Sequence, residues 1–103
     1  MACAHLKSRG YQIIAQNKRF GRAEIDIIAQ REGVLVFVEV KLRSHGAFGP
    51  PESFVSPAQA DRYHEAATAY IEGVGWSGPI RFDIVALEKK GSKMLLKHFE
   101  DAF

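Results

Sequence analysis

AEIDIIAQREGVLVFVEVK, residues 23–41, is the stretch of sequence that decides the fold. Its two flanks are rich in Ile, Val and Phe, which favours β-strands, and Arg31-Glu32-Gly33 between them is typical of a tight turn. A two-residue loop at Glu32-Gly33 pairs Arg31 with Val34, so the stretch predicts a β-hairpin with that register.

That register brings polar side chains together on one face of the hairpin. Asp26 lies opposite Glu39. Glu24, two residues before Asp26, lies opposite Lys41 on the same face. The other face is wholly apolar and comprises Ile25, Ile27, Ala29, Val36, Val38 and Val40. A three-residue loop would instead put Asp26 and Glu39 on opposite faces, so the predicted site depends on the turn.

Two facing carboxylates destabilise a sheet unless something compensates them. Opposed Cβ atoms are about 4.5–5.5 Å apart, and like charges at that distance repel. Asp26 and Glu39 therefore either share a proton or hold a cation. Mg²⁺ suits them, because it takes one or two carboxylates together with water and phosphate oxygens. Lys41 beside such an ion can orient a water or neutralise charge that develops on a phosphoryl transition state.

The composition indicates one globular domain without a membrane segment. The chain has 103 residues, of which 47% are hydrophobic and 25% charged. No apolar run approaches the ~20 residues of a membrane span, and nothing resembles a signal peptide. Cys3 is the single cysteine, which excludes an internal disulfide and predicts a cytoplasmic protein. The net charge of +2 is too small by itself to indicate a nucleic-acid partner.

Basic side chains are concentrated near the start of the chain. Residues 1–23 contain no acid and carry Lys7, Arg9, Lys18, Arg19 and Arg22. This end is either a surface that faces phosphate or a solvated basic rim. The expected contacts to nucleic acid are Arg19, Arg22, Arg43 and His45, the last two in the segment that follows the hairpin.

The remaining sequence predicts two helices and three further strands. The expected elements are a helix over 2–9, a strand over 11–15, a polar connection over 17–21, the hairpin strands, a helix from Pro57 whose apolar positions recur as far as Val74, and strands over 80–87 and 94–99. This αβββαββ order predicts an α/β sandwich. Its central sheet is mixed, because the second helix makes the fourth strand parallel to the third.

Several side chains outside the hairpin have two readings. Gln59 occupies the capping-box position of the second helix, so it either caps that helix or faces the acids at the sheet edge. Arg81 and Asp83 form a structural ion pair or a contact at the sheet end. The remaining expectations are core positions for Tyr63 and Tyr70 and surface positions for His64 and His98.

The motif blocks, taken together, match a known family. They are AHLKSRGYQIIAQN, EIDIIA, FVEVKLRS, FGPPESFVSPAQ, RFDIVAL and DAF, in order over nearly the whole chain. With Asp26 and Glu39-Val40-Lys41 on a hairpin, the chain resembles the PD-(D/E)XK nuclease superfamily. It resembles more closely the uncharacterised protein family 0102, which is related to archaeal Holliday junction resolvases. The resemblance implies a restriction-endonuclease-like fold in a single domain over residues 1–103, and metal-dependent phosphodiester hydrolysis.

The resemblance also implies roles for individual residues. Asp26 and Glu39 correspond to acids that bind Mg²⁺ or Mn²⁺, Lys41 to the catalytic lysine and Gln59 to an accessory catalytic residue. Glu24 stands at the acid of the E-I-D motif and is either a further ligand or a salt-bridge partner of Lys41. Relatives usually begin the first helix with Gly-Glu, whose glutamate adds a third acid. We therefore expect this chain to lack the start of that helix.

Three functions remain open on this basis. The first is an endonuclease acting on branched or otherwise structured DNA. The second is a DNA-binding module that keeps the fold without the chemistry, and the third is a protein-interaction domain in which the polar residues form a charge network. Resolvases act as dimers, so a homodimer is expected by analogy.

Overall fold

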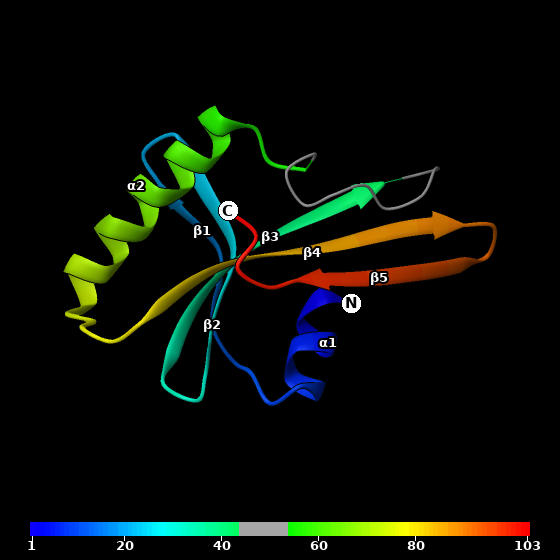
Figure 1. Ribbon diagram of the computed structural model, residues 1–103, viewed down its shortest axis with the longest axis horizontal. Helices are drawn as coiled ribbons and strands as arrows, with labels where there is room; N and C mark the ends of the chain where they lie inside the picture. Colours follow the sequence, from blue (N-terminus) through cyan, green and yellow to red (C-terminus); the bar gives the residue numbers. More distant parts are fainter. Residues whose placement is uncertain (44–53) are drawn as a thin grey trace.

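A five-stranded β-sheet with a helix on each side forms the protein in the computed structural model (Figure 1), which describes residues 1–43 and 54–103. The elements are α1 (Ala2–Ser8), β1 (Gln12–Phe20), β2 (Ala23–Arg31), β3 (Val34–Arg43), α2 (Pro57–Val74), β4 (Ile80–Lys90) and β5 (Lys93–Phe99). The strands lie in chain order across the sheet. Only β3 and β4 are parallel, and the other three pairs are antiparallel. The predicted mixed α/β architecture is confirmed.

The β2–β3 hairpin has the predicted turn and register. Glu32 and Gly33 have φ angles of +51° and +79°, the positive values that a two-residue type I′ turn requires. Arg31 pairs with Val34, and the ladder continues in that register as far as the pair Ile27–Val38. The two-residue loop on which the site depends is therefore present.

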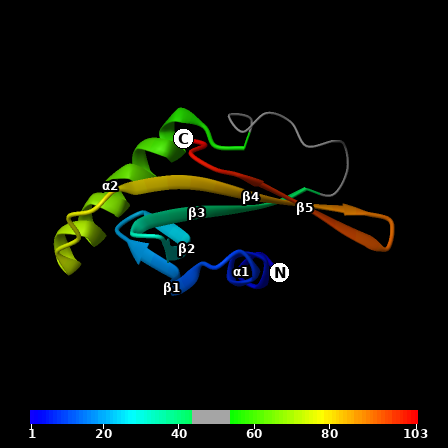
Figure 2. The same cartoon turned by 60° about the horizontal axis from the view of Figure 1, so that its bottom comes forward.

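Each face of the sheet is covered by its own helix (Figure 2). On one face α1 inserts Leu6 against a cluster that includes Ile27, Val36 and Val38. On the other face α2 presents Tyr63, Ala66 and Ala67, which pack on Ile28, Leu35 and Phe37. The sheet is thus buried on both sides, and polar side chains within it need specific partners.

One predicted apolar face is wrong at a single residue. Ile25 packs in the α2 cluster and not beside Ile27. The strict alternation of the strand fails between them. The regular pairs Gln16–Ile27 and Lys18–Ile25 flank Asn17, which has a φ of +51°. This left-handed residue in β1 lies across from Asp26, and a positive φ departs from the regular pleat of a strand.

The first strand is longer than predicted. β1 runs to Phe20, and residues 17–20, expected to be a connection, pair with β2 up to Phe20–Ala23. Polarity alone suggested a loop. The ring of Phe20 packs edge-on against Tyr70 of α2 at 6.2 Å between centroids, which gives this end of the strand a partly buried apolar anchor.

Helix α2 begins as the sequence predicts. The Gln59 N–H donates to Ser56 Oγ at 3.1 Å, and the Ser56 N–H donates to Gln59 Oε1 at 3.0 Å, which completes a capping box with Pro57 next in line. The helix ends at Val74 and is capped by Gly75, whose φ is +72°. In the described ranges, no helix has the length and apolar character needed to span a membrane.

Candidate active site

Strands β2 and β3 separate at one end of the hairpin, as Figure 1 shows. Their ladder stops at Ile27–Val38, yet β2 stays paired with β1 as far as Ala23 and β3 stays paired with β4 as far as Arg43. Each strand therefore follows its outer neighbour, and a notch opens between them. Asp26 and Glu39 are the first residues beyond the last pair.

Asp26 lies across this notch. Its Oδ2 accepts a hydrogen bond from the Val40 N–H at 2.8 Å, and its own N–H donates to the Tyr63 hydroxyl at 3.1 Å. That hydroxyl in turn donates to the Val38 carbonyl at 2.9 Å. Side chains of Asp26 and Tyr63 thus satisfy backbone groups that the interrupted ladder leaves without partners.

Glu39 is the acid with the perturbed protonation. Burial, a hydrogen bond to Asp26 and the charge of Asp26 together raise the pKa of Glu39 to about 8, against a lowering influence of Lys41. At neutral pH Glu39 is therefore mostly protonated and donates to the Asp26 carboxylate. A pair of acids that holds a proton in this way releases it when a cation takes the proton's place.

The other predicted site residues lie around this pair. Lys41 is half-buried on β3, close enough to act on the pKa of Glu39. Glu24 is exposed, and in the described part of the chain its ion pair is with Arg19 at 3.7 Å and not with Lys41. The predicted cross-strand pairs Asp26–Glu39 and Glu24–Lys41 are not part of the ladder, because β2 and β3 separate after Ile27–Val38.

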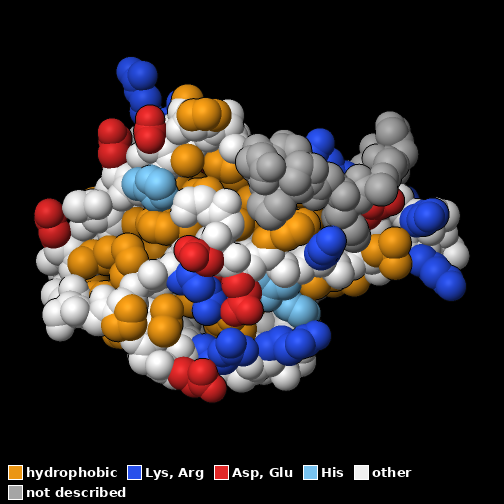
Figure 3. All heavy atoms as spheres, viewed as in Figure 1, with side chains coloured by type: hydrophobic (Ala, Val, Ile, Leu, Met, Phe, Trp, Pro, Cys, Tyr) orange, Lys and Arg blue, Asp and Glu red, His pale blue; other side chains and the backbone are white. Residues whose placement is uncertain are grey.

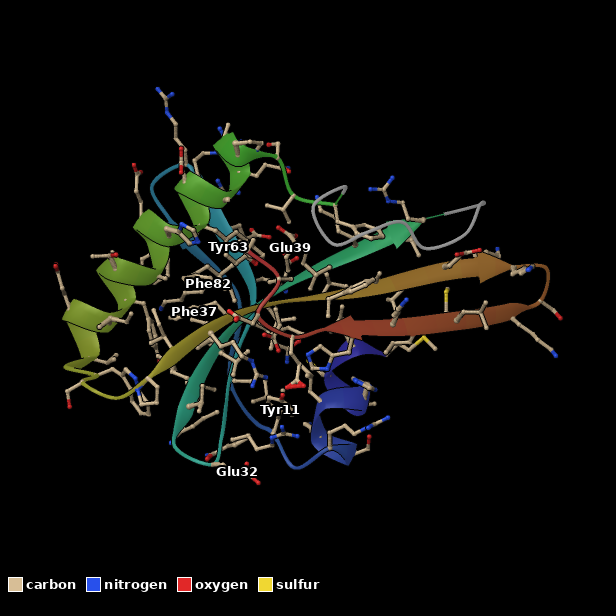
Figure 4. All side chains as sticks on the ribbon, in the orientation of Figure 1. Tyr11, Glu32, Phe37, Glu39, Tyr63 and Phe82 are labelled. Atoms are coloured by element: carbon tan, nitrogen blue, oxygen red, sulfur yellow. The ribbon has the colours of Figure 1, made fainter. Side chains whose placement is uncertain are left out.

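A small cavity of about 120 Å³ opens beside Glu39 under the first turns of α2. Figure 4 shows Glu39 next to Tyr63 at this place. Its polar lining consists of Arg22, Glu24, Glu39, Gln59, Arg62 and Tyr63. Asp26 borders a different cavity of about 400 Å³, on the side of the sheet where α1 lies. The two acids are thus reached from opposite faces of the sheet.

Gln59 both caps α2 and lies near the acids, the two alternatives that the sequence left open. Its Oε1 is engaged in the capping box, while its side chain borders the cavity that contains Glu39. Arg22 borders the same cavity. Arg43 lies with its guanidinium 4.6 Å from the centre of the Phe54 ring. His45 lies outside the described residues.

The family model described as Uncharacterised protein family UPF0102 matches residues 1–87. The chain belongs to this family. A UPF0102 protein of Cytophaga hutchinsonii is 48% identical over 86 residues, covering 84% of this chain and 76% of the relative. One from Flavobacterium psychrophilum is 46% identical over 98 residues, covering 95% and 82%. One from Anaeromyxobacter dehalogenans is 40% identical over 104 residues, covering 100% and 78%.

The UPF0102 chain offers oxygen ligands at the notch. Over residues 1–43 and 54–103, no group of three or more His, Cys, Asp or Glu side chains is arranged to hold a metal. Asp26 and Glu39 alone are a pair of hard oxygen donors, which fits an ion that keeps water and substrate oxygens in its remaining positions. Mg²⁺ and Mn²⁺ are ions that prefer oxygen donors of this kind.

Two residues of the UPF0102 site were not among those predicted for it. Tyr63 was expected in the core and is indeed buried, but its hydroxyl also ties α2 to both separated strands. A buried tyrosine needs a partner for its O–H, and that need is the signal in the sequence. Arg62 borders the Glu39 cavity and follows Gln59 by three residues, the spacing of one helix face.

A second polar cluster lies between α1 and the end of β5, where Figure 3 shows acidic, basic and histidine side chains together. Asp83 is fully buried and accepts from Arg81 Nε and Nη2 at 2.8 Å each, which confirms a structural ion pair. His98 Nε2 lies 2.8 Å from Asp83 Oδ2, and the His98 side chain is only 13% exposed. The surface position predicted for His98 is wrong, since β5 pairs with β4 and turns the ring onto Asp83.

Removing one hydroxyl at the notch is expected to destabilise the fold. Tyr63→Phe leaves the Asp26 N–H and the Val38 carbonyl without their side-chain partner, at a cost of about 1–3 kcal/mol in the free energy of unfolding. Tyr70→Phe is the matched control, because the Tyr70 ring packs on Phe37 and its hydroxyl forms no hydrogen bond in the described part of the chain. Urea denaturation measures the free energy of unfolding of both variants. Equal losses in Tyr63→Phe and Tyr70→Phe would contradict the role of the Tyr63 hydroxyl as a bridge between the strands.

Proposed function

We propose that this UPF0102 protein is a metal-dependent endonuclease that hydrolyses phosphodiester bonds in branched or otherwise structured DNA. The restriction-endonuclease-like fold implied by its motifs is part of this proposal. The observation that carries it is the notch, where the hairpin strands separate and two carboxylates meet in reach of one lysine. A hairpin needed only for stability has no reason to keep two acids and their shared proton between its strands.

The residues at the notch divide the chemistry between them. Asp26 and Glu39 would hold Mg²⁺ or Mn²⁺, which supplies a Lewis acid for the phosphate and a more acidic water. Glu39 would bind the ion as a carboxylate, with its proton released to solvent. Lys41 orients the attacking water or neutralises charge on the phosphoryl oxygens as the transition state forms. Asp26 keeps its orientation through the Val40 N–H, and Tyr63 holds the backbone on either side.

A cleavage panel tests the proposal. Four-way junction, flap, single-stranded and linear DNA are incubated with Mg²⁺, Mn²⁺ or a chelator. We expect cleavage only with metal, and a loss of about 100-fold or more in Lys41→Ala. Lys93→Ala is the matched control, since Lys93 is exposed at the β4–β5 turn and should leave cleavage unchanged. Cleavage that persists in Lys41→Ala would point to a contaminating nuclease and remove the mechanism.

The second candidate is a DNA-binding module of the same fold that does not hydrolyse its ligand. It is favoured by the small set of acids, since the described residues bring only Asp26 and Glu39 into the notch. Salt-dependent DNA binding without cleavage would support it. Calorimetric titration with Mn²⁺ separates both candidates from a protein-interaction domain. Absence of binding, with no difference on Glu39→Ala, would overturn the metal site.

A further inference from the structure

A larger cavity adjoins the notch on the α2 side. Its volume is about 600 Å³, and it lies between the β1–β2 turn and the middle of α2. Its lining includes Phe20, Arg22, Arg62, Glu65, Ala66 and Ala69, and we call it the arginine cavity. Arg22 and Arg62 also border the small cavity that contains Glu39, so the two spaces meet along these side chains.

The charge of the arginine cavity suits a single phosphate group. Arg22 and Arg62 are exposed, and no acid of the described residues forms an ion pair with either. Glu65 is the one acid in the lining, which leaves one net positive charge. A guanidinium matches phosphate with two parallel hydrogen bonds, so two of them across a cavity can clamp one phosphate.

The floor of the arginine cavity is apolar and made largely of small residues. Ala66 is buried and Ala69 lies one turn along α2, so the helix presents no long side chain there. Phe20 forms the opposite side, with its ring held by Tyr70. Pockets of about 300–1,000 Å³ accept small ligands, and 600 Å³ has room for one sugar and base. A base that is still paired and stacked in a duplex cannot enter it.

We propose that the arginine cavity holds one unpaired nucleotide next to the phosphate that is cleaved. Arg22 and Arg62 bind its phosphate, and the apolar lining of Phe20, Ala66 and Ala69 receives its sugar and base. The choice of a DNA strand rests on the proposed function. The cavity then supplies a physical reason for a preference for structured DNA, because a base that is already unpaired enters without the cost of unstacking.

Equilibrium binding without metal tests the arginine cavity apart from the chemistry. Fluorescence anisotropy compares a single-stranded oligonucleotide, a forked duplex and a blunt duplex of equal length, in the presence of a chelator. Arg22→Ala and Arg62→Ala should each weaken binding of the single strand and the fork by about 10-fold or more. Blunt duplex binding should change no more than in Lys93→Ala, which removes the same charge at the distant β4–β5 turn.

A second variant separates shape from charge. Ala69→Trp fills the arginine cavity at an exposed helix position and leaves both guanidinium groups in place. It should weaken single-strand binding by about 10-fold with unchanged duplex binding and an unchanged helical spectrum. The proposal is overturned if the Arg22→Ala/Arg62→Ala double variant binds the single strand like the parent, or if blunt duplex binding falls equally.

The outcomes also distinguish this proposal from the nuclease itself. If the parent protein cleaves nothing but the arginine variants lose single-strand binding, the nucleotide site stands and the hydrolysis falls. If the parent cleaves junctions and the double variant cleaves them with unchanged KM and kcat, the hydrolysis stands and the nucleotide site falls.

Discussion

Asp83→Ala is expected to lower the free energy of unfolding by about 3–5 kcal/mol, because it removes one partner of a buried charge pair. Asp83 is fully buried, and its carboxylate accepts from Arg81, from His98 and from the Asp101 N–H at 3.0 Å. Among the described residues, the variant leaves the Arg81 guanidinium with Glu100 as its acidic partner, a pair at 3.1 Å on the exposed side. A loss of that size is a large share of the stability of a small domain.

The same carboxylate anchors the end of the chain. The Asp101 N–H bond to Asp83 precedes Phe103, whose ring packs on Tyr63 and Phe82 at 5.3 and 5.4 Å between centroids. Loss of Asp83 should therefore loosen this segment and the α2 packing above it. Proteolysis of the native state would detect the loosening before global unfolding.

Urea denaturation at pH 7 measures the effect of Asp83→Ala, with Asp61→Ala on the exposed face of α2 as the matched control. The control should change stability by less than about 0.5 kcal/mol. Asp83→Asn keeps the shape and should fall between the two. Equal stability of Asp83→Ala and Asp61→Ala would show that the cluster has no structural role.

The pH dependence of this cluster has a definite sign. Burial by itself raises the pKa of Asp83, but hydrogen bonds from His98, Arg81 and the Asp101 N–H outweigh it and hold the pKa below its ordinary value. The contribution of Asp83 is therefore complete above the ordinary carboxyl pKa and is lost as the pH falls through the lower native value. The fall in the free energy of unfolding at acidic pH should therefore be smaller in Asp83→Asn than in the parent.

The hairpin could be predicted from sequence because its information is local. A Glu-Gly pair between two apolar runs selects a two-residue turn, and that turn sets every later pair of the ladder. The start of α2 was predictable for the same reason, since Ser56, Pro57 and Gln59 specify it within four residues.

The geometry of the notch could not be predicted in this way. It depends on Asn17 in β1, on Tyr63 in α2 and on β4, which keeps β3 paired while β2 turns away. These partners are distant in sequence, and strict alternation carried through Asp26 put Ile25 on the wrong face. His98 was misplaced for a similar reason, because its partner Asp83 reaches it only through the pairing of β5 with β4.

Glu39→Gln is expected to abolish metal-dependent cleavage and to stabilise the metal-free protein. On the proposed function, a metal ion supplies several kcal/mol of transition-state stabilisation, so loss of one of the two acids proposed to bind it should slow cleavage by about 10³-fold or more. The amide can still donate a hydrogen bond to Asp26, as the protonated acid does. It cannot add a second negative charge to the notch. On the proposed function, Glu39 is therefore retained at the expense of stability.

The stability gain of Glu39→Gln should increase as the pH rises, because burial and the charge of Asp26 raise the pKa of Glu39. Glu39 has a native pKa of about 8 against an ordinary value of 4.5, so the folded protein binds more protons than the unfolded chain between these values. The parent therefore loses stability as the pH rises from 4.5 to about 8. Glu39→Gln has no such loss, so its gain in the free energy of unfolding over the parent is absent at pH 4 and greatest above pH 8. Because solvent screens a half-buried group, we expect this gain to be about 1 kcal/mol, or roughly 4–8 °C in Tm.

Thermal unfolding from pH 4 to 9 in a chelator measures this difference, with Glu72→Gln on the exposed side of α2 as the matched control. The Tm of the control should differ from that of the parent by the same amount at every pH. Adding Mn²⁺ at pH 8 should raise the Tm of the parent and leave that of Glu39→Gln unchanged, because only a ligand bound to the native state shifts unfolding. A Glu39→Gln curve that stays parallel to the parent would mean that the two acids do not share a proton. Cleavage retained in that variant would place the metal elsewhere, since the same carboxylate accounts for both effects.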